Sequence, residues 1–181
     1  MSIAVESYRP DITSQDSQTL FSSRWADSKR YVLMAVQILW LNDNCEVTLK
    51  RSTLHPTHEG RYKASDEGDL WVTTPDGRSG VVEVKHNTRN FTCAEDWPLR
   101  FPSTILDESY KYERRPPLAY MLFSQDGEHL LVADIKHKDK WFCREQVDPI
   151  WKRQARYICA PLEVVRFYKR SDCRVFLQEE D

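Results

Sequence analysis

The segment from Leu118 to Ser124 is the strongest constraint on the fold, because it is a continuous apolar run. Such a run is typical of a central strand of a sheet that is covered on both faces. The chain has 181 residues, 40% of them hydrophobic, which is the usual size of one domain with its own core. We therefore expect a single domain built around a buried sheet.

An amphipathic helix and three strands are predicted ahead of this run. Ser22 or Ser23 can cap a helix that runs from about Arg24 to Leu41. Its apolar side chains recur at three- and four-residue steps and are Trp25, Val32, Ala35, Val36, Leu39 and Trp40. The predicted strands are Cys45–Lys50, Leu70–Thr74 and Gly80–His86. Pro75-Asp76-Gly77 is a turn sequence that joins the last two strands into a hairpin.

The remaining segments complete the prediction of an α/β fold with a central mixed sheet flanked by helices. We predict a helix from Ser103 to Arg114, with an extended chain over part of it as the alternative, and a strand from His129 to Ile135 after the Asp126-Gly127 turn. We also predict a helix from Asp148 to Tyr157 and a hairpin of Glu163–Tyr168 and Arg174–Leu177 around Ser171-Asp172. Residues 51–68 and 87–102 are predicted loops. Residues 1–22 are predicted as a flexible N-terminal arm, ahead of one domain over 23–181.

Charge and cysteine content restrict the class of protein. The formal net charge is −2, which excludes a strongly basic coat but leaves room for a local basic patch. The five cysteines form no C-x-x-C pair, so no structural zinc motif is present and free, mostly buried thiols are expected. The longest apolar-rich stretch, from Tyr31 to Leu41, is far short of the ~20 residues that cross a bilayer. With no signal-peptide pattern, we expect an intracellular, cytoplasmic protein, in the host cytoplasm if the source is viral.

The predicted hairpin brings together the residues that indicate chemistry. Glu83 and Lys85 share one face of their strand, because side chains alternate, and Asp69 lies at the start of the facing strand. Two carboxylates form a hard oxygen site suited to Mg²⁺, which Mn²⁺ can replace. A neighbouring lysine can orient an attacking water and neutralise developing charge. This combination suits metal-assisted hydrolysis of a phosphodiester bond.

On Asp69, the 13-residue gap and Glu83-Val84-Lys85, the chain resembles the PD-(D/E)xK nuclease superfamily. The resemblance implies a restriction-endonuclease-like αβββαβ core over about 24–124, with 125–181 as a C-terminal helix and hairpin elaboration. It also implies that Asp69, Glu83 and the Val84 backbone carbonyl bind the metal and that Lys85 assists the water. The chain departs from the pattern in that Gly68, not proline, precedes Asp69. The interior of the predicted first helix also lacks an acid. Asp27 lies in its first turn, and the polar residue deeper in the helix is Gln37, which carries no charge.

The short pattern of an acid two residues before a lysine is not specific. It occurs three times, as Asp27-Ser28-Lys29, Glu83-Val84-Lys85 and Asp134-Ile135-Lys136. Only the middle copy has an acid across a predicted hairpin and a helix before the sheet. The structural alternative is that Asp69, Glu83 and Lys85 are solvated charges on an ordinary hairpin.

The sequence leaves several partners and roles open. Lys111, Arg114 and Arg115 follow the motif on a predicted helix and are the expected contacts to a nucleic-acid backbone. His86 either contacts substrate or is polar surface. DNA is the expected substrate, and a homodimer is compatible with a core of this kind. The alternatives are a non-catalytic nucleic-acid- or protein-binding module on the same scaffold, and an RNA-directed nuclease.

Overall fold

A computed structural model of the chain describes residues 28–49, 69–99, 101–147 and 154–177. The predicted 1–22 arm, the 51–68 loop and the helix cap at Ser22 or Ser23 lie outside these residues. The described part is an α/β fold with two sheets and few helices. None of its helices is long and apolar enough to cross a membrane.

The larger sheet, sheet A, has six strands in the order β1-β2-β3-β5-β6-β9. It is mixed, because β3 and β5 are parallel and all its other neighbouring pairs are antiparallel. Its strands are β1 (Glu46–Leu49), β2 (Leu70–Thr73), β3 (Ser79–His86), β5 (Ala119–Phe123), β6 (His129–Asp134) and β9 (Arg166–Lys169). Four predicted strands are present in this sheet. They are the two strands of the hairpin (β2 and β3), the apolar run (β5) and the strand after the Asp126-Gly127 turn (β6).

The smaller sheet, sheet B, has three antiparallel strands in the order β4-β8-β7. They are β4 (Ser103–Glu108), β8 (Gln154–Pro161) and β7 (Phe142–Val147). Short helices join the strands: α3 (Ser109–Arg114), η2 (Ile135–Lys140), η3 (Leu162–Val164) and η4 (Arg170–Asp172). The sequence pattern did not predict β7 or a second sheet.

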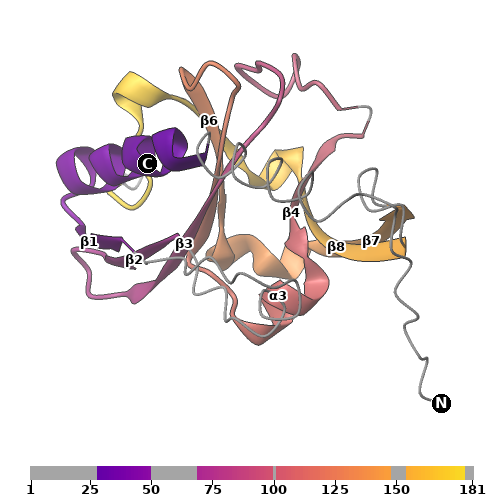
Figure 1. Ribbon diagram of the computed structural model, residues 1–181, viewed down its shortest axis with the longest axis horizontal. Coiled ribbons are helices and arrows are strands. Elements are labelled where there is room, and N and C mark those ends of the chain that lie inside the picture. Colours follow the sequence, from indigo (N-terminus) through magenta and orange to yellow (C-terminus); the bar gives the residue numbers. More distant parts are fainter. Residues whose placement is uncertain (1–27, 50–68, 100, 148–153, 178–181) are drawn as a thin grey trace, which may run out of the picture.

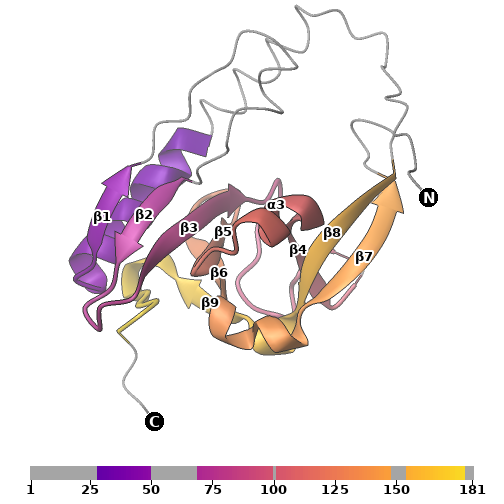
Figure 2. The same cartoon turned by 90° about the horizontal axis from the view of Figure 1, so that it is seen from below.

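Sheet A separates two hydrophobic cores. A helix over 28–37, continued by the π-helical turn η1 (Ile38–Asn42), packs Tyr31, Ala35 and Leu39 onto one face of sheet A. The opposite face packs against sheet B through Tyr120, Leu131 and Ile158, among others. Figures 1 and 2 show the helix and sheet B on opposite sides of β3 and β6. The central strand β5 is thus covered on both faces, as its continuous apolar sequence requires.

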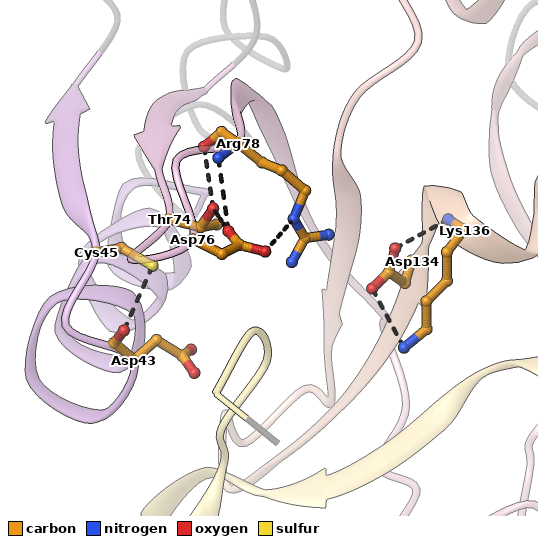
Figure 3. A network of polar contacts seen from close by, with 7 residues as sticks. All are labelled: Asp43, Cys45, Thr74, Asp76, Arg78, Asp134 and Lys136. Atoms are coloured by element: carbon orange, nitrogen blue, oxygen red, sulfur yellow. Dashed lines mark hydrogen bonds and ion pairs between the residues drawn. The ribbon is translucent and has the colours of Figure 1, made fainter. Parts of the chain in front are cut away.

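The hairpin turn between β2 and β3 follows from its residues. The Gly77 N–H donates to the Thr74 carbonyl at 2.9 Å, and the Thr74 N–H donates to the Arg78 carbonyl at 2.8 Å. Gly77 has φ +85°, a backbone conformation that favours glycine. Pro75 is the second residue of the turn, and its ring fixes its own φ at the value that this position needs. The Asp76 carboxylate also accepts from the Thr74 hydroxyl and from Arg78 Nε (Figure 3). This turn holds the hairpin in register with Leu70 opposite Val82.

The helix predicted over Ser103–Arg114 is wrong for its first half. Residues 103–108 form β4, and only Ser109–Arg114 form the helix α3. Ser103, Thr104 and Leu106 are buried, and β4 pairs with β8, a strand about fifty residues further on. Burial against a distant strand therefore overrides the local helix signal.

The helix predicted over Asp148–Tyr157 is also wrong where it is described. Residues 148–153 lie outside the described residues, and 154–157 are the first half of β8. β8 is the central strand of sheet B, and the four residues Tyr157 to Ala160 are all buried. Pairing on both edges and burial favour an extended chain there.

The final hairpin predicted around Ser171-Asp172 is replaced by a different arrangement. β9 pairs with β6, η4 follows it, and residues 173–177 form no strand. The Asp43 carboxylate, which is fully buried, accepts from the backbone N–H groups of Val175, Phe176 and Leu177 at 2.9, 3.0 and 3.1 Å. These amides are therefore satisfied by a side chain instead of by a partner strand.

The five cysteines are free, as predicted, and Cys45, Cys159 and Cys173 are buried. Burial, together with the neighbouring Asp43 carboxylate, raises the pKa of Cys45 and that of Cys173 to about 12. These three thiols therefore act as small core side chains.

Candidate active site

Asp69 lies directly before β2, and its side chain is hydrogen-bonded to the backbone of the neighbouring strand β3. Its Oδ2 atom accepts a hydrogen bond of 2.8 Å from the backbone N–H of Val84. The last residue pair of the ladder on this side is Leu70 with Val82, so one further step places Asp69 across from Glu83. The N–H and C=O of one residue project from the same side of a strand, so the Val84 carbonyl faces the same edge as Asp69. The Asp69 carboxylate and the Val84 backbone thus lie together at one edge of β3, one ladder step from Glu83.

Glu83 and Lys85 lie on the face of β3 that is turned toward sheet B. Val82 and Val84 belong to the core against the helix, and strand alternation places Glu83 and Lys85 on the other face. The parallel register puts Glu83 next to Tyr120, which belongs to the core against sheet B. The alternation predicted from the sequence therefore holds.

The Lys85 ammonium is paired with a residue that the sequence did not single out. Nζ of Lys85 lies 3.3 Å from Oδ1 of Asp107 on strand β4. The Asp107 side chain is only 10% exposed and that of Lys85 33%. Asp107 was assigned to a helix; the signal for a strand was the β-branched pair Thr104-Ile105 just before it.

A buried tyrosine lies beneath the lysine. Nζ of Lys85 is 5.9 Å from the centre of the Tyr120 ring, and Tyr120 is 1% exposed. Burial, with the carboxylates of Asp107 and Glu83 nearby, raises the pKa of the Tyr120 hydroxyl. The hydroxyl therefore stays protonated and is available as a donor.

The other two copies of the acid-x-Lys pattern differ from the middle one. Asp27 lies outside the described residues. Asp134 caps η2 by accepting from the Lys136 N–H at 2.9 Å, and the Lys136 ammonium lies 3.8 Å from the same carboxylate (Figure 3). That copy is a closed local pair at a helix start, whereas Lys85 is paired with a carboxylate from the other sheet.

Of the three residues predicted to contact a nucleic-acid backbone, only Arg115 has a contact with the strands of the candidate site that can be described. Lys111 and Arg114 lie in the last turn of α3, and Arg115 caps it. The Arg115 guanidinium lies 5.5 Å from the centre of the Trp71 ring on β2, two residues beyond Asp69. The C-terminal end of α3 therefore contacts β2 through Arg115 and Trp71.

His86 lies on the opposite face of β3 from Glu83 and Lys85. Its ring stacks on that of Tyr31 at 4.6 Å with an interplanar angle of 6°. The structure therefore places His86 between β3 and the helix, in a packing role and away from the site.

The donor types of the candidate site are oxygens, which Mg²⁺ prefers. Mg²⁺ keeps several waters and is usually held by one or two carboxylates together with substrate phosphates. Asp69 and Glu83 with the Val84 carbonyl supply hard oxygen donors of that kind. A denser site is not present: among residues 28–49, 69–99, 101–147 and 154–177, no three His, Cys, Asp or Glu side chains gather in a group that could hold a metal ion.

Comparison of the chain with protein-family models, with curated proteins and with solved structures finds no match.

Proposed function

We propose that the protein is a metal-dependent nuclease that hydrolyses phosphodiester bonds in DNA. The observation that carries the proposal is the hydrogen bond from the Val84 N–H to the Asp69 carboxylate. It fixes one acid of the motif on the strand that holds Glu83 and Lys85. The contact lies between the two strands of the hairpin and brings the Asp69 carboxylate to the backbone of the Glu83-Val84-Lys85 segment.

The order of the strands supports a restriction-endonuclease-like core. β1, β2 and β3 form an antiparallel meander, and a crossover that contains α3 leads to β5, parallel to β3. With the helix ahead of β1, this order is similar to the αβββαβ order that the resemblance implies, but the crossover also contains β4 of sheet B ahead of α3. The site lies on the face of sheet A turned toward sheet B.

Each residue has a defined role in the proposed reaction. Asp69, Glu83 and the Val84 carbonyl would hold Mg²⁺, which when bound polarises the phosphate and acidifies a water. Lys85 places a positive charge beside the carboxylates, where it orients the attacking water and stabilises negative charge that develops on the phosphate. Arg115, whose guanidinium lies 5.5 Å from the centre of the Trp71 ring, would bind the DNA backbone next to the site.

A cleavage assay with matched variants tests the proposal. Linear duplex, circular and single-stranded DNA are incubated with the protein and Mg²⁺, Mn²⁺ or EDTA. We expect metal-dependent cutting that Lys85→Ala and Asp69→Ala abolish, while circular dichroism shows that both variants are folded. A lowered thermal unfolding midpoint is expected in both, because Lys85→Ala leaves Asp107 without its cation and Asp69→Ala leaves the Val84 N–H without its acceptor. The control is Lys136→Ala, which removes the lysine of the Asp134-Ile135-Lys136 copy and should cut normally. Cutting that survives in both site variants would overturn the assignment.

The same assay separates the alternatives. A non-catalytic module is favoured by the near-neutral charge and by the absence of a denser acidic group in the described part of the chain. It would bind neither Mg²⁺ nor Mn²⁺ at the hairpin and would cut nothing. An RNA-directed nuclease would cut a matched RNA in preference to the DNA, since this chemistry does not itself distinguish the sugar.

A further inference from the structure

The pair of Lys85 and Asp107 links the two sheets at the candidate site. Lys85 lies on β3 of sheet A and Asp107 on β4 of sheet B, with 3.3 Å between the charged atoms. The Asp107 side chain is 10% exposed, and a carboxylate so poorly hydrated needs a partner. The Glu108 backbone N–H donates to Asp107 Oδ1 at 2.9 Å, and Lys85 supplies the charged partner across the interface.

The backbone of β4 is irregular at this position. The pairing with β8 shifts in register between Ile105 and Asp107, which leaves Leu106 as an extra residue. Leu106 is buried in the core between the sheets. Bulges of this kind redirect a side chain and are frequent next to active sites. The bulge thus allows Asp107, as well as Leu106, to turn inward.

Tyr120 supports the same arrangement from below. Its ring lies under the Lys85 ammonium, and its hydroxyl has no hydrogen-bond partner among the described residues. A buried hydroxyl without a hydrogen-bond partner lowers the stability of the folded state. The Tyr120 hydroxyl can therefore donate to a water or to a reacting group at this position. Lys85, Asp107 and Tyr120 therefore form one unit with Glu83 beside it.

We propose, building on the nuclease function above, that Asp107 is a positioning residue that holds the Lys85 ammonium in its working orientation. A lysine side chain has many rotamers, and an ion pair from the facing sheet selects one of them before substrate binds. Asp107 acts through Lys85 and does not touch the substrate. Its loss should therefore affect the chemical step and leave DNA affinity unchanged.

The test compares Asp107→Asn, which keeps the side-chain volume, with Asp107→Glu, which keeps the charge. We expect Asp107→Asn to lower kcat about 10- to 100-fold at an unchanged DNA dissociation constant. Asp107→Glu should recover a large part of that loss, which a purely structural role would not predict. Circular dichroism and thermal unfolding confirm that each variant is folded.

Asp134→Asn is the matched control, since Asp134 is also largely buried, at 13% exposure, and paired with a lysine. It should cost stability at the start of η2 and leave kcat unchanged. Wild-type cutting lost in Lys85→Ala but unchanged in Asp107→Asn would overturn the positioning role and leave the nuclease standing. A loss in Asp107→Asn that Asp107→Glu does not repair would also overturn it. A wild-type protein that cuts no substrate would overturn both proposals.

Discussion

At the residue scale, Asp96 closes a short loop between β3 and β4. Its carboxylate accepts from the N–H groups of Thr92 and Cys93 at 2.8 and 2.9 Å and from the Thr92 hydroxyl at 2.8 Å. The Cys93 and Thr92 backbone amides, with that hydroxyl, lower the pKa of Asp96 to about 2. The loop also carries Phe91 and Trp97, which pack with Phe167 in the core against sheet B.

This shift predicts how the loop responds to pH. A folded-state pKa below the unfolded value stabilises the loop fully above about pH 4, and the stabilisation is lost as pH falls through about 2. NMR should therefore show the amide resonances of Thr92 and Cys93 moving with a midpoint near pH 2. In Asp96→Asn this transition should be absent. A midpoint near 4 would show that the hydrogen bonds do not form in solution.

At the scale of elements, Asp43 holds the C-terminal segment in place. It lies directly after η1, and its carboxylate accepts from three consecutive amides that follow η4. Its backbone carbonyl accepts from the Cys45 thiol at 3.7 Å (Figure 3). Asn42 adds a 2.9 Å hydrogen bond from its Nδ2 to the Cys173 carbonyl. Two segments far apart in sequence are thus joined beside the core that contains Cys173 and Val175.

Asp43→Ala should lower the free energy of unfolding by about 2–5 kcal/mol, because it leaves buried amides without an acceptor. Urea denaturation measures the loss of unfolding free energy. In limited proteolysis, the segment that follows Cys173 should be cleaved faster than in the wild type. Asp139→Ala, at an exposed position on η2, is the control and should behave like the wild type. Equal stability of the two variants would contradict the anchoring role of Asp43.

At the scale of the whole molecule, the site lies between layers that hold together without it. The core against the helix and the core against sheet B are both apolar, so removal of metal should leave the fold intact. The candidate site depends on both layers, because Glu83 and Lys85 come from sheet A, Asp69 lies directly before its strand β2, and Asp107 comes from sheet B. Metal binding should therefore stabilise an already folded protein.

Thermal unfolding tests this linkage directly. At a Mn²⁺ concentration about 100 times the dissociation constant, the folded state gains about 2.7 kcal/mol, which raises Tm by several degrees. The double variant Asp69→Asn, Glu83→Gln should show no such rise, and Asp134→Asn should show the full rise. EDTA should lower Tm only to the metal-free value. A rise of the same size in the double variant would place the metal elsewhere.

The elements that sequence pattern predicts well are those whose cause is local. The Pro75-Asp76-Gly77 turn, the alternation in β3 and the apolar run of β5 each depend on neighbouring residues, and all three are present. The candidate site residues on this hairpin could be selected from the sequence for the same reason. Asp107 could not, because its approach to Lys85 depends on a bulge and on pairing with a strand about fifty residues away.

The sequence by itself therefore determined the hairpin, the buried strand after it and the shared face of Glu83 and Lys85, since these follow from periodicity and turn chemistry. Only the tertiary structure decided that residues 103–108 and 154–161 are strands and that the last segment is bound by Asp43. In these cases the stabilising partner is distant in sequence. Burial and pairing with such a partner outweigh local propensity, and no window of neighbouring residues contains that information.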